Sequence, residues 1–165
     1  MKFAYADPPY HGYGKSHYGE THAEAAVWDD LQSHLDLLDL LMAQYPDGWA
    51  LSANPKDLHW ILGHLGDKLR VCAWAKTFHQ IRPNCSVQYA WEPVVLYGGR
   101  QIKGRKPMVR DWMACARSMK KGLRGAKPDA FNKWVLELLG YQVRDELIDL
   151  FPGTGGMAAT VANYN

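Results

Sequence analysis

Four consecutive residues near the start of the chain, Asp7-Pro8-Pro9-Tyr10, combine a carboxylate, a rigid backbone and an aromatic ring. Residues 3–6 before them are strand formers, and the two prolines prevent both further strand pairing and a helix. We therefore expect a buried strand that ends in a stiff turn at Asp7. In open α/β sheets ligands bind at the carboxyl ends of the strands, so this turn is a candidate binding site.

These residue types suit a planar substrate that carries an exocyclic amine. Asp7 and the carbonyl of Pro8 can each accept one N–H of the amine, while the ring of Tyr10 stacks on the planar group. An aromatic amine is a weak nucleophile because its lone pair is delocalised into the ring. Two acceptors on its hydrogens favour a pyramidal nitrogen and stabilise the charge that develops during attack. The alternative is a proline-rich turn with an incidental Asp.

A second candidate ligand loop lies near the other end of the chain. Residues 145–150 predict a strand with an acidic end, followed by Phe151-Pro152-Gly153-Thr154-Gly155-Gly156 and a helical pattern over residues 157–162. Glycines let a ligand approach the backbone, and the start of a helix offers free N–H groups. The loop has neither the Lys-Ser/Thr pair of a P-loop nor the glycine spacing of a dinucleotide-binding turn.

The rest of the pattern predicts an α/β domain with a largely parallel sheet. Helices are expected over residues 23–45, 56–65 and 131–139, and further strands over 49–53, 69–78 and 87–97. The last two of these strands are joined without a helix, which favours antiparallel pairing. Pro93 indicates an edge position or a bulge. Residues 11–22, rich in Gly, Tyr and His, predict either a lid over the site or a plain connector.

Length and composition favour one soluble domain over residues 1–165. Apolar residues make up 47% of the chain and charged residues 22%, with neither a signal segment nor a membrane span. Three separated cysteines without a C-x-x-C pair argue against zinc and a disulfide framework. These cysteines favour a reducing cytoplasm. The histidines have no metal-ligand spacing, so we expect no metal.

Basic residues are concentrated in one segment, about residues 98–127. Ten of the 19 Lys and Arg residues lie between Arg100 and Lys127, where Asp111 is the only acidic residue. This charge distribution is typical of a protein that binds a phosphate backbone, and a solvated loop is the alternative. The candidate nucleic-acid contacts are Arg100, Lys103, Arg105, Lys106 and Arg110.

The two loops together resemble those of the DNA N6-adenine methyltransferases that use S-adenosylmethionine. Asp7-Pro8-Pro9-Tyr10 is similar to their catalytic motif, and the stretch from Asp149 to Gly155 to their cofactor loop. Lys127-Pro128 is similar to the pair that opens the helix before that loop. The catalytic motif precedes the cofactor loop, as in the beta group, and the chain resembles the short phage-type members.

The resemblance implies a Rossmann-like methyltransferase sheet and methyl transfer to adenine N6 in DNA. It places Asp7, Pro8, Pro9 and Tyr10 at the target amine, and the basic segment where larger relatives insert a recognition domain. S-adenosylmethionine would contact Asp7, Lys127, Asp149, Phe151, Gly153, Thr154 and Gly155. The alternatives are N4-cytosine methylation, whose enzymes usually carry Ser in place of the first Asp, and a non-catalytic DNA-binding subunit. A phage-encoded protein would act in the host cytoplasm.

One departure concerns the end of the sheet. Larger relatives continue past the cofactor loop into a strand whose acidic end binds the cofactor ribose, whereas ten residues follow Gly155 here. We therefore expect a sheet shortened at the C-terminus. Its edge would be covered by residues 157–165, by a second copy or by a partner subunit. Asn163 and Asn165 are the candidates for holding the ribose.

Overall fold

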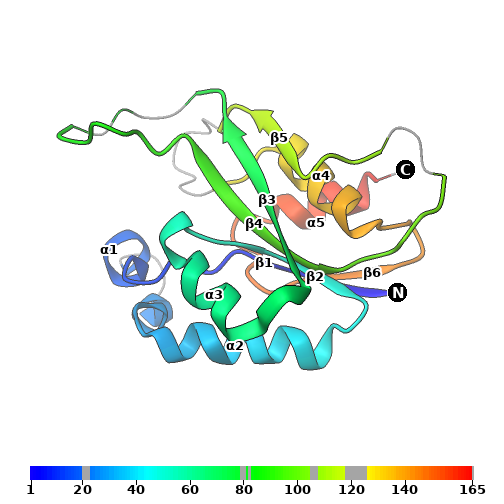
Figure 1. The fold of residues 1–165 in the computed structure, drawn as a ribbon, viewed down its shortest axis with the longest axis horizontal. Helices are drawn as coiled ribbons and strands as arrows, with labels where there is room; N and C mark the ends of the chain where they lie inside the picture. The colour runs from blue at the N-terminus through cyan, green and yellow to red at the C-terminus, as the bar shows by residue number, and fades with distance from the viewer. Residues whose placement is uncertain (20–22, 79–80, 82, 105–107, 118–125, 165) are drawn as a thin grey trace.

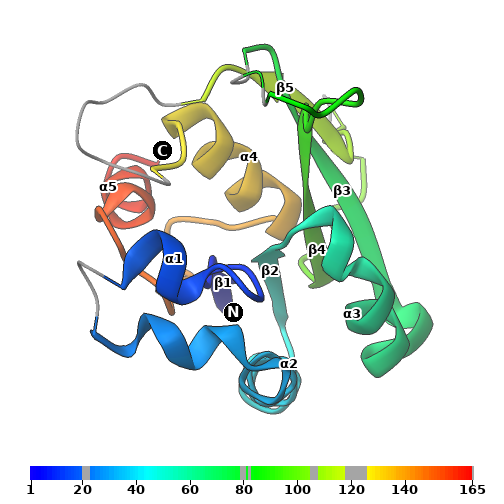
Figure 2. The ribbon, with the colours of Figure 1, turned by 90° about the vertical axis from the view of Figure 1, so that its left-hand side faces the viewer.

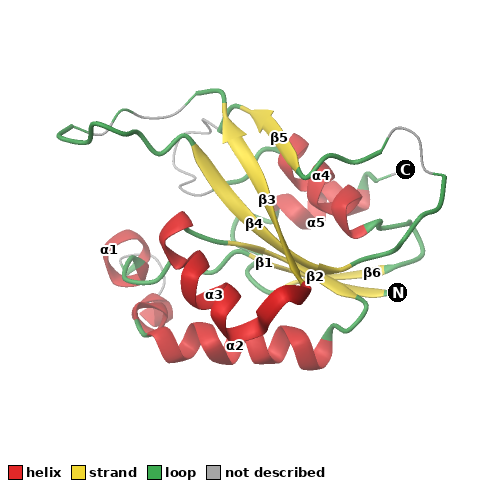
Figure 3. Cartoon of the chain, in the orientation of Figure 1, coloured by secondary structure: helices red, strands yellow, loops and turns green. Residues whose placement is uncertain are grey.

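A six-stranded sheet forms the middle layer of the molecule, with helices on both faces (Figures 1 and 3). The computed structural model describes residues 1–19, 23–78, 81, 83–104, 108–117 and 126–164. The strands are β1 Lys2–Ala6, β2 Gly48–Ser52, β3 Leu69–Lys76, β4 Trp91–Gly98, β5 Trp112–Cys115 and β6 Glu146–Asp149. The α-helices are α1 Gly14–Tyr18, α2 Leu31–Gln44, α3 Leu58–Leu65, α4 Asp129–Leu139 and α5 Gly156–Ala162; short 3₁₀ turns cover Ala23–Asp29, Pro55–Asp57 and Gly66–Lys68.

The strands lie in the order β5-β3-β4-β2-β1-β6. Neighbouring strands are parallel except at β4, which runs antiparallel to both β2 and β3. The antiparallel pairing expected for the two strands that no helix joins is therefore confirmed. Because β1, β2 and β6 are parallel, the residues that follow them gather at one end of the sheet, which faces the viewer in Figure 2.

The strand β1 is buried on both faces, which fixes the layers. Phe3 and Tyr5 belong to the core shared with α4, where the Tyr5 and Phe131 rings lie 6.4 Å apart. Ala4 and Ala6 face the opposite core, which α2 and α3 complete. This alternation follows the two-residue period of a strand, and it holds the turn at Asp7 on a rigid base.

Pro93 occupies an interior strand, so the expected edge position is wrong. It lies on β4, between β2 and β3, opposite Ala73. Its carbonyl accepts a hydrogen bond from the Ala53 N–H at 3.1 Å, just past the end of β2. The N–H that proline lacks would face the same neighbour, because both groups of one residue in an antiparallel strand point to one side. The N–H that Pro93 lacks would therefore point to a place just past the end of β2.

The helix expected over residues 23–45 is divided in two. A 3₁₀ turn over Ala23–Asp29 is followed by α2, and Asp30 between them is extended, with φ −90° and ψ 132°. The Asp30 side chain accepts from the Gln32 N–H and caps α2, as Asp does at helix starts. Asp29 accepts from the N–H groups of Gly14 and Lys15, which ties the turn to α1.

Two elements were not expected from the sequence. The short helix α1 lies within residues 11–22, and β5 lies within the basic segment, where it pairs in parallel with β3. At the other edge, β6 pairs only with β1 among the described strands. The tail after β6 packs mainly on α4, with the Tyr164 ring 5.6 Å from the Tyr141 ring. No helix formed by the described residues is long and apolar enough to cross a membrane.

Candidate active site

The two candidate loops follow neighbouring strands of the sheet. Tyr5 of β1 pairs with Asp149 of β6, and the Leu150 N–H donates to the Tyr5 carbonyl at 3.0 Å. Asp7 and the loop after Asp149 therefore leave the sheet side by side, although one stands near each end of the chain. This juxtaposition depends on the position of β1 next to the edge strand β6, which the strand order provides.

Lys127, two residues before α4, connects Asp7 to a second carboxylate. Its Nζ lies 3.1 Å from Asp7 Oδ1 and 3.3 Å from Glu92 Oε2, at the start of β4. Glu92 also forms an ion pair with Lys76, the last residue of β3, and accepts a hydrogen bond from the Tyr10 hydroxyl at 3.1 Å. The result is a mostly buried chain of charges that joins β1, β3, β4 and α4.

The charges in this group shift one another's pKa values. Burial raises the pKa of Asp7 above its usual range, and the Lys127 ammonium opposes that shift. Burial alone would raise the pKa of Glu92 as well, but Lys127 and Lys76 hold it at about 2. Burial alone would lower the pKa of Lys127, yet the surrounding acidic groups, Asp7 first, hold it well above the usual value. Lys127 therefore remains an ammonium and Glu92 a carboxylate.

Aromatic rings form a wall beside the charges. The Lys127 Nζ lies 5.9 Å from the ring centroid of Tyr10 and 5.7 Å from those of Trp74 and Phe131. A cation this close to several ring faces is attracted by them, which holds the ammonium in place. Pro8 is buried and Pro9 half-buried, and the Tyr13 N–H donates to the Tyr10 carbonyl to close the turn. A planar group beside Asp7 would meet the Tyr10 ring.

The glycine loop after β6 has the backbone that a close ligand approach requires. Gly153 and Gly155 have φ of +46° and +74°, which residues with a β-carbon rarely adopt. A β-carbon on Gly155 would meet nothing within 4 Å, so the loop is open on that side. The Asp149 side chain accepts from the Phe151 N–H, and burial, followed by the charge of Asp7, raises the Asp149 pKa. These residues fit a ligand with an ammonium group.

Side chains behind this loop hold it against α4. Thr160 of α5 donates to Asp129 at 2.9 Å and accepts from the buried Asn132 amide at 3.2 Å. The Phe151 ring packs on Trp28, with centroids 4.9 Å apart. Thr154 is exposed at the tip of the loop. Asn163 ends α5 and donates to the Ala159 carbonyl, and Asn165 lies outside the described residues.

The expected nucleic-acid residues do not gather around Asp7. Arg100 forms an ion pair with Asp145 at 2.6 Å, near the amino ends of the parallel strands and thus at the opposite end of the sheet. Lys103 is exposed on the loop that follows, and the Arg110 guanidinium lies 5.8 Å from the Trp112 ring. Arg105 and Lys106 lie outside the described residues. Arg117, which follows β5, is near Lys76 of the site, since its charge affects the Lys76 pKa.

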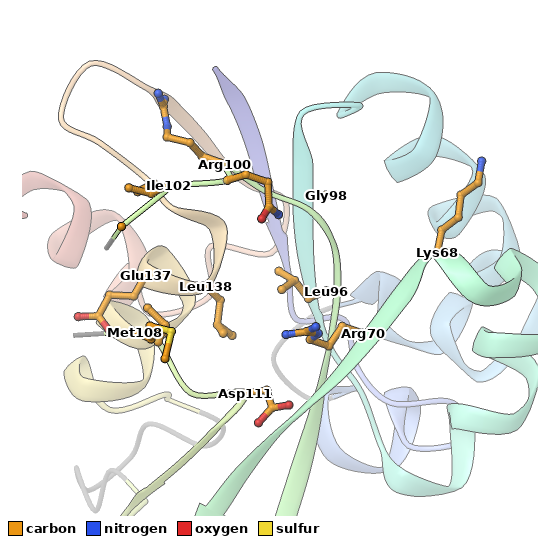
Figure 4. Close-up of a pocket in the computed structure, with 13 residues that line it drawn as sticks. Lys68, Arg70, Leu96, Gly98, Arg100, Ile102, Met108, Asp111, Glu137 and Leu138 are labelled. Atoms are coloured by element: carbon orange, nitrogen blue, oxygen red, sulfur yellow. The ribbon is translucent and has the colours of Figure 1, made fainter. Parts of the chain in front are cut away.

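A large cleft also lies away from Asp7 (Figure 4). It has a volume of about 820 Å³ and is bounded by β3, β4, the loop after β4, and α4. Arg70, Leu96, Met108 and Glu137 are among its lining residues. The cleft shares no residue with the Asp7 and Lys127 group.

Two residues of the site, Glu92 and Lys76, were not predicted from the sequence. Both flank the long connection between β3 and β4, and opposite charges at the two ends of a predicted antiparallel pair are the signal that could have found them. The pairing of Trp74 with Glu92 places the Glu92 side chain on the α4 side of the sheet, toward Lys127. Lys127 itself was expected beside the cofactor loop, whereas the structure places its ammonium on Asp7.

Solved structures share this fold. One is the complex of M1.HpyAVI with SAM, at TM-score 0.61 and 14% identity, covering 99% of this chain and 78% of the other. Another is TTHA0409, a candidate DNA modification methylase from Thermus thermophilus, at TM-score 0.58 and 15% identity, covering 99% and 77%. The same protein complexed with S-adenosyl-L-methionine gives TM-score 0.53 at 15% identity, covering 98% and 77%. No protein-family model and no curated protein matches the sequence.

These likenesses establish the fold. The expected class, an α/β Rossmann-like methyltransferase sheet that is mostly parallel with an antiparallel strand, is confirmed. The chain is matched over almost its whole length, and it spans more than three quarters of each solved chain. Identity of 14–15% carries no residue roles, so those rest on the geometry of this chain.

Proposed function

We propose that this protein transfers a methyl group from S-adenosylmethionine to the N6 amine of adenine in DNA. The observation that carries the proposal is the position of the Asp7-Pro8-Pro9-Tyr10 turn beside the loop from Asp149 to Gly155, on neighbouring strands. The solved structures that share this fold support the cofactor and the substrate class, since one is a complex with SAM and another is a candidate DNA modification methylase with S-adenosyl-L-methionine.

The residues of this chain would bind and orient both reactants. Asp149, Phe151, Gly153, Thr154 and Gly155 would hold the cofactor, which supplies an electrophilic methyl group on a positively charged sulfur. Lys127 stays charged and would stand between the cofactor's carboxylate and Asp7. The cofactor's ammonium would lie beside Asp149. The Asp149 carboxylate accepts from the Phe151 N–H at the start of the loop, and it could also accept from that ammonium.

At the amine, Asp7 and the Pro8 carbonyl would accept the two N–H groups while the Tyr10 ring stacks on adenine. The cofactor would supply the methyl group and keep the carbon–sulfur electron pair, and the amine nitrogen would gain positive charge. The Asp7 carboxylate would accept the proton that the nitrogen then loses, and its raised pKa suits an acceptor. An adenine stacked in a duplex cannot reach Asp7, so the base must be unpaired or flipped out.

Partners are proposed at two places, DNA at the basic segment and a protein chain at the edge of the sheet. The basic residues Lys103 and Arg110, with Arg100, Arg105 and Lys106, would contact phosphates away from the target base. A second copy or a partner subunit would pair along β6, which has one neighbour among the described strands. The mass in solution of the purified protein, with and without DNA, tests the second point.

The activity is tested by incubating the protein with S-adenosylmethionine and unmethylated DNA, and then separating the nucleosides by mass spectrometry. N6-methyladenine is the expected product. N4-methylcytosine would keep the reaction class and replace the base. Binding of S-adenosylhomocysteine measured by calorimetry, without any methylated product, would instead indicate a subunit without catalytic activity. Absence of both would overturn the proposal.

A further inference from the structure

Two tryptophans lie on one face of the outer sheet. Ala75 of β3 pairs with Trp91 of β4, and Ala73 pairs with Trp112 of β5. Paired residues on neighbouring strands point to the same face, and so do residues two apart on one strand, so both rings share the face of Ala73 and Ala75. Trp74 between them faces the other way, where its ring lies 4.9 Å from Phe131 of α4.

This face is open. Trp112 is 50% exposed, Trp91 39% and Val71, on the same face of β3, 37%. In Figure 2 α3 lies beside the lower part of β3. Beside the upper part of β3 and β5, the figure shows a helix, α4, on the opposite face of the sheet but none on this face. Several large apolar side chains exposed together on a sheet mark an interaction surface, because isolated ones are common and clustered ones are not.

The charges around this face favour a phosphate-bearing partner. Arg110 lies over the Trp112 ring and Arg117 follows β5, within the segment where ten basic residues face a single acidic one. A second copy docking here would bring two basic segments together and meet repulsion. A nucleic-acid strand would bring phosphates to the arginines and bases to the rings.

The open face and the active-site charges lie on opposite faces of the sheet, and they meet at the carboxyl end of β3. Cys115, at the end of β5, pairs with Lys76, whose ammonium forms the ion pair with Glu92. The Thr77 N–H donates to the Cys115 carbonyl at 3.3 Å, so β5 and the end of β3 are joined at this point. A strand whose target base lies beside Asp7 could therefore pass around the carboxyl end of β3 to reach Trp91 and Trp112.

We propose that Trp91 and Trp112 form a base-stacking surface for an unpaired stretch of DNA beside the target adenine, which rests on the function proposed above. Two strand spacings and two residues along β3 separate the rings by roughly 12 Å, so each contacts a different base. Bases inside a duplex offer no free ring face. The preferred substrate is therefore single-stranded or locally melted DNA.

The test measures the affinity of the whole protein for a labelled short single strand and for the matched duplex. The wild type should bind the single strand more tightly, and Trp91→Ala and Trp112→Ala should each weaken that binding by about tenfold. Trp112→Phe should retain most of the affinity and Trp112→Leu should lose it, because stacking needs a ring. Val143→Ala, at a residue 69% exposed away from this face, is the matched control and should change nothing.

Equal affinities in the wild type and both alanine variants would overturn the stacking surface, even if methylation and cofactor binding are normal. So would sedimentation of the wild type as a dimer that Trp112→Ala dissociates, since the face would then join two copies. If the wild type binds the cofactor product but no DNA, this inference and the DNA substrate both fall. Far-ultraviolet circular dichroism checks that each variant keeps its fold.

Discussion

Asp7 and Asp145 are two carboxylates near opposite ends of the sheet, and each faces a basic side chain. Asp145 is bound by the Met1 ammonium at 2.8 Å, by Arg100 through both oxygens, and by the Gln142 N–H at 2.8 Å. Burial alone would raise its pKa, but these partners together lower it. Asp7 has Lys127 on one oxygen and a weaker hydrogen bond from the Ser52 side chain, and burial still raises its pKa.

The difference separates a structural carboxylate from a reactive one. Asp145 has its acceptor capacity filled, so its charge is stabilised and it fastens a turn to the rest of the fold. Asp7 keeps capacity for further N–H groups and sits where the charged form costs more. Perturbed groups of this second kind are typical of functional sites.

The largest expected effect is on turnover. Asp7→Ala should lower methyl transfer by about 10²–10³-fold, because it removes an acceptor that stabilises charge in the transition state. Binding of S-adenosylhomocysteine and the melting temperature should change little. Asp145→Asn, compared per folded molecule, should keep its turnover. Near-normal turnover in Asp7→Ala would remove Asp7 from the amine site.

The free energy of unfolding should depend on Asp145 more than on Asp7, the reverse of turnover. Asp145→Asn should lower the free energy of unfolding by about 2 kcal/mol, because it leaves Arg100 and the Met1 ammonium without their partner. Chemical denaturation measures the difference. Asp39→Asn is the control, since the ion pair of Asp39 with His64 is exposed and worth little. An equal loss in both variants would show that burial of Asp145 does not matter.

Lowering the pH should neutralise Glu92 and so weaken its ion pairs in the active site. Glu92 has an ordinary pKa of 4.5 and a folded value of about 2, so its stabilisation is full above pH 4.5 and is lost as the pH falls toward 2. The unfolding free energies of the wild type and Glu92→Gln should therefore converge across this range. A gap that stays constant with pH would mean that the ion pairs do not stabilise the fold.

The pH dependence of the reaction should depend on Lys127. Its ammonium lowers the pKa of Asp7, so Lys127→Gln should move the acid limb of kcat/KM to higher pH. Lys127→Arg keeps the charge and should leave the limb near its original position. An unmoved limb in Lys127→Gln would show that another group titrates.

The smallest expected effect is on the salt dependence of DNA binding, which distinguishes the two ends of the sheet. Arg117→Gln, beside Lys76, should reduce the salt slope of binding by about 0.7 for a single strand. With a short single strand that covers only the site, Lys103→Gln should leave the slope unchanged, because the phosphates proposed to contact Lys103 lie farther along the DNA. A reduced slope for Lys103 alone would favour the basic loop that the sequence indicated.

The sequence predicted most of the elements and the two loops, because hydrophobic periodicity and the Pro and Gly positions mark them locally. It missed β5, since four residues in a basic segment form a strand only through pairing with β3. Pro93 was misplaced because the sequence does not show that β4 pairs with β2, in a register that puts Pro93 just past the end of β2. The role of Lys127 depends on Glu92, which only the register of β3 and β4 brings to it.

The pairing of β1 with β6 also determines when the site can form. Met1 and Asp145 are 144 positions apart in the chain, so the contact between them closes a very long loop. Pairings of such high sequence separation form late, because a long loop must close first. A nascent chain that already contains Asp7, Glu92 and Lys127 still lacks the glycine loop. The site is therefore completed only after the segment that carries the glycine loop has been made and β6 has paired with β1.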